Sequence, residues 1–574
     1  MLIFYDFEVF EHDWLVVFKE VDDKKISTTK IINDREKLES YHSKNKNKIW
    51  IGYNSRHYDQ YILKAILCDF DPKLMSDWII VDGNAGWQFS KFMSKIKVNN
   101  YDVMTTGDRG LKSLEGFMGN DIKESSVPFN LDRKLTEEEI KDVLEYCNHD
   151  VEQTIEVFLQ RISDFEAQIG LIKLANEDAF QINLIGKTKP QMAAHILQAH
   201  RKSYDDEFDI TIPKTIKLKK YKSVQRWYQE PSNMSYYDSD FAKNQLYIDI
   251  AGVPHILGWG GIHGAIPKYN GEGHYINIDV VSYYPSLMIE YNLLSRSVEN
   301  PKKYEEIYTQ RLKCKAEKNP LQAPLKIVLN STYGAMKDSN NALYDPLQAN
   351  QVCVHGQLLL VDLMEKLEPH CQIIQSNTDG VLIKLHDYND YYLIDDVCHE
   401  WEKRTRMKLE FEEFEKVFQK DVNNYVLVDK DGNYKSKGGY VKQLHNLDYD
   451  LPIVNKALIN KMVLNIDIED TINNETMLKE FQLVSKIGGK YDAIYHGEVE
   501  LKEKCIRVFA SKNKSDLGVR KLHKKTGTRA KITNSPPNCF IVNGNVNGKK
   551  IPKKLDKKYY IEMAKRRLEQ FGVR

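Results

Sequence analysis

Two acidic residues stand on what the sequence predicts to be a buried strand. Residues 2–7 and 48–53 are short apolar runs of the kind that form buried strands. Asp6 and Glu8 are two positions apart, so a strand directs both side chains to the same face. Carboxylates that share one face of a buried strand repel each other unless cations hold them. The alternatives are solvated residues at a sheet edge, or one acid that keeps its proton.

Composition excludes several classes of protein. The chain has 574 residues, 42% of them hydrophobic and 29% charged, which excludes a disordered, collagen-like or disulfide-stapled chain. A chain of this length predicts about three to five folding units with sizeable cores. No apolar run approaches the roughly 18 residues that span a bilayer, and the N-terminus has no signal-peptide pattern. The 8 cysteines form no CxxC pair, so we expect no zinc-knuckle site. Scattered thiols fit a reducing cytoplasm, and we expect no membrane partner.

The net charge of zero conceals an asymmetry along the chain. From Leu501 to Arg574 there are 21 Lys and Arg residues but only 5 Asp and Glu residues, a local charge of +16, so the rest of the chain carries −16. A basic end on an acidic body indicates a polyanionic partner at that end. The alternative is a solvated lysine-rich tail.

Apolar periodicity and turn residues predict the order of the remaining elements. Thr136 and Glu139 form a capping-box pattern at the start of one helical segment. The predicted elements are a helix in 135–163, a connector at 169–245, a strand at 274–281, a helical hairpin at 302–337 that turns at Asn319-Pro320, a helix at 347–367, and a β-hairpin at 372–385 that turns at Asp379-Gly380.

Two further acidic motifs follow the first in chain order. NSRHYD (54–59) places Asp59 just after the second strand, and YCNHD (146–150) places Tyr146 and Asp150 at i, i+4 on one helix face. The ordered set DxE, Nx3(F/Y)D and YxxxD resembles the 3′–5′ exonuclease domain of proofreading DNA polymerases. The resemblance implies that Asp6, Glu8, Asp59 and Asp150 bind two divalent metals and that Tyr146 orients the attacking water. It also implies that Asn54, Ser113, Leu114 and Phe117 hold a frayed primer end.

Three later motifs extend this resemblance to family B DNA polymerases. DVVSYYPS (279–286) is similar to motif A, DxxSLYPS, with Tyr283 where Leu is usual. KIVLNSTYG (326–334) matches motif B, KxxxNSxYG, at every specified position. QSNTDG (375–380) stands where motif C has YxDTDS, so Asn377 replaces the first acid.

The resemblance implies a nucleotidyl-transfer site built from these motifs. Asp279, Asp379 and the carbonyl of Val280 would hold two Mg²⁺ ions, with Mn²⁺ as a substitute. Tyr284 would pack under the sugar and reject a 2′-hydroxyl. The nucleotide-binding residues implied are Arg311, Lys315, Lys326, Asn330, Tyr284 and Tyr333, and the DNA-contacting residues are Gly260, Gly261, Tyr425 and Lys437, with Asn423 where Lys is usual. A basic helix stripe is otherwise most often a solvated face.

The sequence therefore predicts an α/β multidomain protein, an RNase H-like exonuclease domain followed by a right-hand polymerase. The expected domains are 1–168 exonuclease, 169–245 connector, 246–300 first palm part, 301–337 fingers, 338–450 second palm part and 451–574 basic thumb.

The function expected is template-directed DNA synthesis with proofreading, of a compact bacteriophage type in the host cytoplasm. Asp279 to Lys326 spans 47 positions and Asn330 to Asp379 spans 49, which leaves no chain for the insertions of protein-primed relatives, so we expect a nucleic-acid primer. Partners would be primer-template DNA, deoxynucleoside triphosphates, and a single-strand binding protein or other replisome factors. The alternatives are a nuclease whose palm is an inactive DNA platform, and a non-enzymatic primer-end binding protein.

Overall fold

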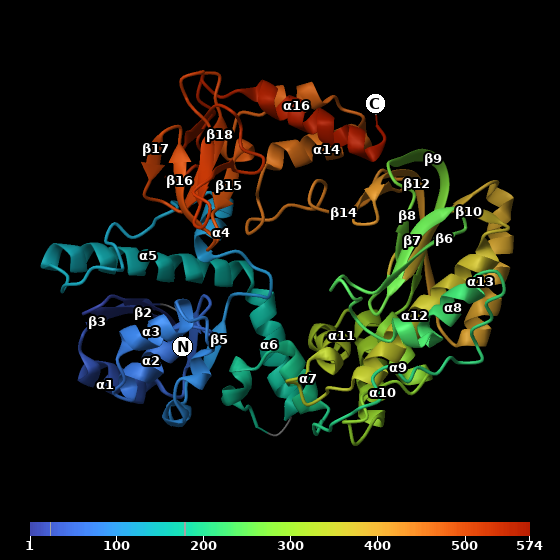
Figure 1. Ribbon diagram of the computed structural model, residues 1–574, viewed down its shortest axis with the longest axis horizontal. Coiled ribbons are helices and arrows are strands. Elements are labelled where there is room, and N and C mark those ends of the chain that lie inside the picture. The colour runs from blue at the N-terminus through green and yellow to red at the C-terminus, as the bar shows by residue number, and fades with distance from the viewer. Residues whose placement is uncertain (23–24, 177–178, 574) are drawn as a thin grey trace. The chain divides into compact units, whose positions relative to one another are not determined.

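The protein divides into two compact units, which we describe separately (Figure 1). A computed structural model describes residues 1–22, 25–176 and 179–573. Two positions of the expected exonuclease domain, two positions of the expected connector and the last position of the expected thumb therefore lie outside the described residues. Unit 1 comprises Met1–Lys187, Leu444–Ile453 and Glu475–Tyr559, and unit 2 comprises Thr188–Gln443, Val454–Asn474 and Tyr560–Arg574. The expected thumb range, 451–574, is thus shared between both units.

A five-stranded mixed sheet forms the centre of unit 1. Its strands are β1 (Leu2–Val9), β2 (Trp14–Asp22), β3 (Lys25–Ile32), β4 (Ile49–Gly52) and β5 (Asn100–Asp102), in the order β3-β2-β1-β4-β5. β1, β2 and β3 pair antiparallel, whereas β4 lies parallel to β1 and β5 parallel to β4. Both predicted strands are confirmed as the central pair, β1 and β4. Alternate residues of these strands enter hydrophobic clusters on opposite faces, with Phe4 and Ile51 on one and Tyr5 and Trp50 on the other.

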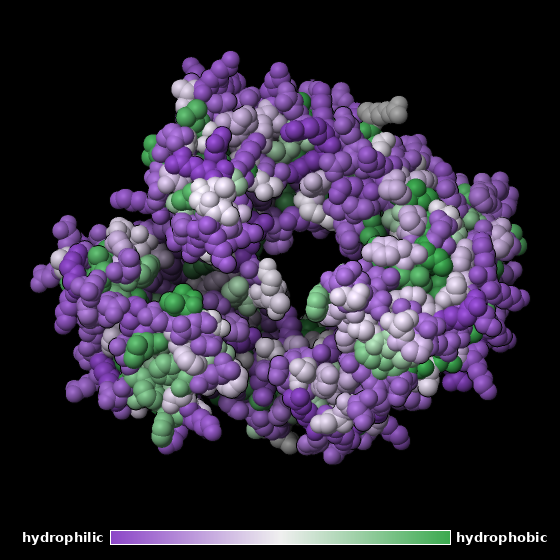
Figure 2. Space-filling model, viewed as in Figure 1, coloured by the Kyte–Doolittle hydropathy of each residue, from purple (hydrophilic) through white to green (hydrophobic). Residues whose placement is uncertain are grey.

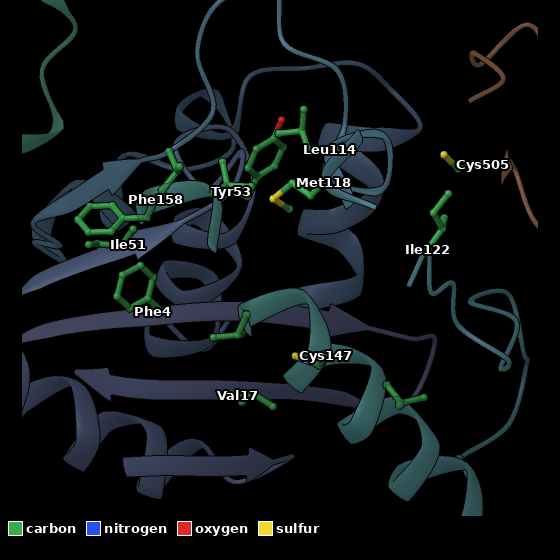
Figure 3. Close-up of a cluster of buried hydrophobic side chains, with 14 of the residues drawn as sticks. Phe4, Val17, Ile51, Tyr53, Leu114, Met118, Ile122, Cys147, Phe158 and Cys505 are labelled. Carbon is green, nitrogen blue, oxygen red and sulfur yellow. The ribbon is translucent and has the colours of Figure 1, made fainter. Parts of the chain in front are cut away.

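Helices cover both faces of this sheet. They are α1 (Arg35–Asn45), α2 (Asp59–Leu67), α3 (Pro72–Ile80), α4 (Leu111–Met118), α5 (Glu137–Gln160) and α6 (Ile162–Ala175). The predicted capping box begins α5, because the Thr136 hydroxyl accepts from the Glu139 amide and the Glu139 carboxylate accepts from the Thr136 amide at 2.8 Å. Figure 3 shows Cys147 of α5 in the same hydrophobic cluster as Leu114 and Met118 of α4.

Two small antiparallel sheets from residues 475–559 complete unit 1. One contains β15 (Leu483–Lys486), β18 (Cys505–Ala510) and β21 (Cys539–Ile541), and the other β16 (Tyr491–His496), β17 (Val499–Leu501), β19 (Val519–His523) and β20 (Arg529–Lys531). The fully buried guanidinium of Arg507 joins them to α4 and its C-terminal loop. It donates to the carbonyls of Gly116 at 3.0 Å, Asn120 at 2.7 Å and Gly544 at 2.8 Å.

Unit 2 is built on a nine-stranded sheet. Its order is β14-β13-β12-β9-β11-β10-β8-β7-β6. The strands are β6 (Gln245–Ile250), β7 (Val253–Gly258), β8 (His263–Ala265), β9 (Tyr269–Val280), β10 (Cys371–Ser376), β11 (Gly380–Leu385), β12 (Leu409–Asp421), β13 (Asn424–Val428) and β14 (Tyr434–Lys437). The predicted strand at 274–281 is confirmed as the second half of β9, which ends at Val280. The predicted hairpin is confirmed as β10 and β11, with its turn at 377–379 and Gly380 already in the second strand.

The helices of unit 2 include the predicted helical hairpin and the predicted helix at 347–367. They are α7 (Lys189–Ile196), α8 (Lys222–Gln229), α9 (Tyr283–Glu290), α10 (Lys302–Ala316), α11 (Gln322–Lys337), α12 (Pro346–Leu367), α13 (Tyr391–Thr405), α14 (Pro452–Leu464) and α15 (Ile468–Asn474), and α16 (Lys557–Leu568) enters the unit from unit 1. The buried residues of α12 lie on every face of the helix, as expected for a helix at the centre of a large core. Asp345 caps α12 and pairs with Arg296 at 2.8 Å.

Hydrophilic residues cover most of the face seen in Figure 2, with apolar residues in small patches. Among the described residues, no helix combines the length and the apolar character that crossing a bilayer requires.

Replacing Arg507 with Met should destabilise unit 1 by about 1–3 kcal/mol, because it removes the buried guanidinium that donates to the carbonyls of Gly116, Asn120 and Gly544. Thermal unfolding measures the loss, and hydrogen exchange of residues 111–120 should accelerate. The matched control is the exposed Arg520→Met, which should change stability by less than about 0.5 kcal/mol. An unchanged midpoint for Arg507→Met would contradict this account of how residues 475–559 are held.

Candidate functional site

The four acids of the first predicted site converge in unit 1. Asp6 and Glu8 lie on β1, Asp59 begins α2, and Asp150 lies on α5. The Phe7 amide donates to Asp59 Oδ1 at 3.0 Å, which ties α2 to the strand between the two acids. Asp59 is 3% exposed and Asp150 is 6% exposed. The side chains of Asp6, Glu8 and Cys147 bring their ligand atoms within 4.8 Å of one another.

Mutual repulsion in this cluster favours protonation. Burial raises the pKa of Asp6, and the charges of Asp59 and Glu8 raise it further. Burial also raises the pKa of Glu8, with a further contribution from Asp150. Burial raises the pKa of Asp59 to about 7, against the hydrogen bond from Phe7, and that of Asp150 to about 6. Oxygen donors that repel in this way are the ligands that Mg²⁺ and Mn²⁺ prefer, so the residues fit a divalent metal site.

Lys112 is a member of this site that sequence reasoning missed. Its buried ammonium group contacts Asp150 directly, donates to Glu115 at 3.1 Å and lies 4.5 Å from the centroid of the Tyr146 ring. Burial alone would lower the pKa of Lys112, but Asp150 and Glu115 raise it above its ordinary value. The only sequence signal was a lysine three positions before a glutamate on an apolar helix. Its charge partly compensates the acidic cluster.

The expected primer-end residues divide into two kinds. Asn54 is exposed and has a left-handed backbone, with φ of 60°, and its amide donates to Asp102 Oδ1 at 2.9 Å. Ser113, Leu114 and Phe117 on α4 are almost completely buried, and the last two belong to the hydrophobic core of unit 1. Tyr146 is held near the acids, where burial and then Asp150 raise the pKa of its hydroxyl.

The second predicted pair of acids lies at the end of two adjacent strands in unit 2. Asp279 at the end of β9 pairs with Gly380, the first residue of β11. The Val280 amide donates to the Asp379 carbonyl at 2.8 Å. Burial raises the pKa of Asp279 to about 6, with further contributions from Asp379 and Glu412. This pair of carboxylates therefore also fits a divalent cation.

Glycine at position 380 permits this approach. A Cβ atom there would collide with the Asp279 carboxylate and would lie 2.9 Å from the Ile278 carbonyl oxygen. Burial and then Asp279 raise the pKa of Tyr425 on β13, whereas the neighbouring side chain of Asn377, which replaces an acid of the family pattern, lowers it. Lys437 on β14 pairs with Tyr425 across the sheet.

A cavity of about 470 Å³ opens above Asp379, and we call it the nucleotide cavity. Most of the residues predicted to bind a nucleotide line this cavity. Glu410, Thr378 and Ser282 also line it, and the sequence did not predict them. Its walls carry Val280, Tyr284, Arg311, Lys315, Lys326, Asn330 and Asp379. Arg311 donates to the Ser282 hydroxyl at 2.6 Å, and Lys315 pairs with Glu410 at 3.5 Å. Tyr333 lies behind Tyr284, with ring centroids 4.4 Å apart.

Tyr283, the departure from the usual leucine, is buried. Its hydroxyl donates to the Gly356 carbonyl of α12 at 2.6 Å. Tyr283 is among the residues that line the nucleotide cavity, but its extra hydroxyl group is satisfied by this hydrogen bond to α12.

The comparisons with known proteins leave function to the motifs and the geometry of the two sites. No protein-family model matches the sequence, and a search of curated proteins finds no match. Among solved structures, the chain is similar to the family B DNA polymerase from the hyperthermophilic archaeon Pyrobaculum calidifontis. The identity is 12% and the TM-score 0.42, over 99% of this chain and 77% of that chain.

Replacing Asp59 with Asn should stabilise unit 1 at pH 8 in a metal chelator. The folded pKa of Asp59, about 7, exceeds the unfolded value of about 3.9. The folded state therefore binds the proton more tightly, and the stability from this group is lost as the pH rises from about 4 through about 7. Asn keeps the acceptor for Phe7 without the charge. The gain should be about 2–4 kcal/mol at pH 8 and small at pH 5.

Thermal unfolding at the two pH values makes this comparison. Mn²⁺ should raise the midpoint of the unsubstituted protein at pH 8 and raise that of Asp59→Asn less. Glu39→Gln, on the exposed surface of α1, is the control and should leave both midpoints unchanged. A destabilised Asp59→Asn variant at pH 8 would show that the cluster is not under charge repulsion.

Proposed function

We propose that this chain is a template-directed DNA polymerase of family B, of the compact bacteriophage type, with a proofreading 3′–5′ exonuclease. The observation that carries the proposal is the nucleotide cavity of unit 2. It is lined by Asp379, which precedes the partner of Asp279 across the sheet, and by Arg311, Lys315 and Lys326 from the helical hairpin α10–α11. Acids and basic residues that line one cavity suit a triphosphate and the divalent cations that accompany it.

The residues of unit 2 position and neutralise the reactants. Asp279, Asp379 and the Val280 carbonyl would hold Mg²⁺, or Mn²⁺ in its place, and bound cations neutralise the charge that develops on phosphate and lower the barrier to deprotonating a hydroxyl. Arg311 binds phosphate oxygens bidentately, and Lys315 and Lys326 act as point charges. Asn330 and Tyr333 lie on the same helix face, and Tyr284 contacts the sugar.

Contacts with DNA and further partners follow from the same proposal. Gly260, Gly261, Tyr425 and Lys437 would contact the duplex, and the basic residues after Leu501 would bind its phosphates. Neutralising several phosphates makes affinity fall by roughly 0.9 log unit per contact for each log unit of salt. A single-strand binding protein and other replisome factors are the further partners proposed. The domain limits proposed are those expected from the motifs, 1–168, 169–245, 246–300, 301–337, 338–450 and 451–574.

We assign the exonuclease to unit 1, whose mixed five-stranded sheet supports an RNase H-like domain. Asp6, Glu8, Asp59 and Asp150 would hold the divalent cations that supply charge neutralisation at a scissile phosphate. Tyr146 orients water next to Asp150. Asn54 is exposed and available to a strand end, whereas Ser113, Leu114 and Phe117 would act by shaping the wall behind it.

Asn377 stands where the family pattern has an acid, and this departure favours an alternative to the proposed polymerase, a nuclease whose palm is inactive. Primer extension on a defined template distinguishes the two. We expect extension by the unsubstituted protein in Mg²⁺ or Mn²⁺. Asp379→Ala should lose it by about a thousandfold, because a lost metal ligand raises the barrier by about 4 kcal/mol.

Asn377→Asp is the matched control for Asp379→Ala, since it restores the family pattern beside the same ligand. Its activity should stay within about tenfold of the unsubstituted protein. No extension by the unsubstituted protein in either metal would support the inactive-palm alternative.

The two activities should be separable by substitution. Asp6→Ala combined with Glu8→Ala removes two proposed ligands from unit 1 and none from unit 2. We expect digestion of a labelled single strand to disappear while primer extension persists. Asp6→Asn with Glu8→Gln controls for shape and should behave in the same way. Continued digestion by either double variant would remove the exonuclease assignment.

Tyr284→Ala should admit ribonucleotides, because it removes the ring proposed to meet the 2′-oxygen. The ratio of deoxyribonucleotide to ribonucleotide incorporation measures the effect. Tyr284→Phe keeps the ring and should keep the discrimination. Equal discrimination by the Ala variant and the unsubstituted protein would place the sugar gate elsewhere.

A further inference from the structure

The acidic cluster of unit 1 contains a sulfur atom that the proposed chemistry does not use. Cys147 lies three positions before Asp150 on α5, so the two residues share the helix face that covers β1. The Cys147 thiol donates to the Asp6 backbone carbonyl at 3.3 Å and lies 3.6 Å from Asp6 Oδ2. Asp6, Glu8 and Cys147 each bring a ligand atom within 4.8 Å of the others, and we call these three residues the sulfur cluster.

The carboxylates of the sulfur cluster lack a paired cation in the part of the chain that the structure describes. Cys147 is completely buried, and Glu8 is 8% exposed. Among the described residues Glu8 forms no ion pair, and burial and then Asp150 raise its pKa, although Lys112 lowers it. Buried charges in proteins are paired or coordinate metals. The sulfur cluster therefore needs a cation.

A neighbouring cluster shows the same need met from within the chain. Glu115, His149 and Asp150 also bring their ligand atoms within 4.8 Å of one another. The buried ammonium group of Lys112 donates to Glu115 at 3.1 Å and contacts Asp150. Because Lys112 is committed to that cluster, the sulfur cluster is left to a cation from solution.

The donor atoms indicate the class of this cation. Thiolate ligands select zinc and other thiophilic ions, whereas carboxylates alone suit Mg²⁺ and Mn²⁺. Zn²⁺ is commonly four-coordinate, so three protein ligands leave one position open. Burial and the charges of Asp6 and Glu8 raise the pKa of the Cys147 thiol, and the sulfur keeps its proton until a cation offsets those charges. When the cation binds, the S–H bond breaks, a sulfur–metal bond forms and the proton passes to solvent.

Unit 2 provides a comparison within the same chain. Among the described residues that line the nucleotide cavity, none is a cysteine or a histidine, and the carboxylates come from Asp379 and Glu410. Oxygen ligands of this kind favour hard cations. The acidic sites of the two units are therefore expected to differ in metal preference.

We propose that Asp6, Glu8 and Cys147 bind a thiophilic divalent cation, Zn²⁺, and that Cys147 sets this preference. The inference rests on the proposed exonuclease for the role of Asp6 and Glu8 in hydrolysis, and it names the class of cation that one of its metal positions takes. The binding itself is measurable without any hydrolysis.

Titration of the full, reduced, metal-free chain with Cd²⁺ tests the proposal, because a thiolate bound to Cd²⁺ absorbs in the ultraviolet. A saturable band should appear, and Zn²⁺ should remove it by displacing Cd²⁺. Cys147→Ser should weaken Cd²⁺ binding by at least about tenfold, the smallest loss typical even for removing a partner of a metal ligand. The affinity for Mn²⁺, which prefers oxygen ligands, should not change in this variant.

Two further variants serve as controls. Cys68 is a more accessible thiol of the same unit, with Lys64 and Lys95 as charged neighbours in place of acids. Cys68→Ser should therefore keep the full Cd²⁺ band. Asp6→Asn combined with Glu8→Gln keeps the Cys147 thiol and a similar shape but removes both carboxylates, and it should lose the band.

Persistence of the band at unchanged affinity in Cys147→Ser, or in the Asp6 and Glu8 variant, overturns the proposal. Equal losses of Cd²⁺ and Mn²⁺ affinity in Cys147→Ser also overturn it, because they would show a structural role for the thiol. Digestion of a labelled single strand in Mg²⁺ is followed on the same preparation. Digestion without a Cd²⁺ band contradicts this inference alone, whereas a band without digestion supports the metal preference and contradicts the proposed exonuclease.

Discussion

Repulsion between buried carboxylates is the constraint on which both sites of this protein depend. In unit 1, Asp6, Glu8, Asp59 and Asp150 come from a strand and two helices, and burial with mutual charge raises their pKa values. The buried ammonium group of Lys112 contacts Asp150 and partly offsets this repulsion. Such a cluster costs stability at neutral pH unless cations enter it. The hydrophobic core behind Cys147 and the sheet hydrogen bonds hold the acids together against this cost.

In unit 2, strand pairing brings two carboxylates close together, so the same kind of repulsion arises between fewer charges. Asp279 and Asp379 approach because β9 and β11 are neighbours in the sheet and because Gly380 has no side chain to separate them. Asn377 removes one negative charge, and its amide interacts with Tyr425. The basic residues of α10 and α11 would supply the counter-charge for the triphosphate that we propose as the ligand. The ion pair of Lys315 with Glu410 on β12 joins α10 to the sheet that carries Asp279.

Local patterns in the sequence predicted the helices, the strands and the acidic residues of the two sites. The same patterns do not predict which residues far apart in the chain come into contact. The strands β1 and β4, the capping box at Thr136, the α10–α11 hairpin and the β10–β11 hairpin follow from periodicity and turn residues over a few positions. The contact of Lys112 with Asp150 joins residues 38 positions apart, and that of Arg507 with Gly116 joins residues 391 apart. The periodicity of apolar residues does not indicate contacts between residues so far apart in the sequence. The burial of Leu114 and Phe117 is equally a product of tertiary packing.

We propose that one chain synthesises template-directed DNA in unit 2 and hydrolyses it in unit 1. The most direct measurement uses the unsubstituted protein, a primer–template and Mg²⁺, with one nucleotide supplied at a time and primer length followed on a gel. The account predicts that the primer grows by one residue only with the complementary nucleotide, and shortens from its 3′ end when no nucleotide is supplied. Growth that ignores the template base, or a primer that never lengthens in Mg²⁺ or Mn²⁺, would contradict it.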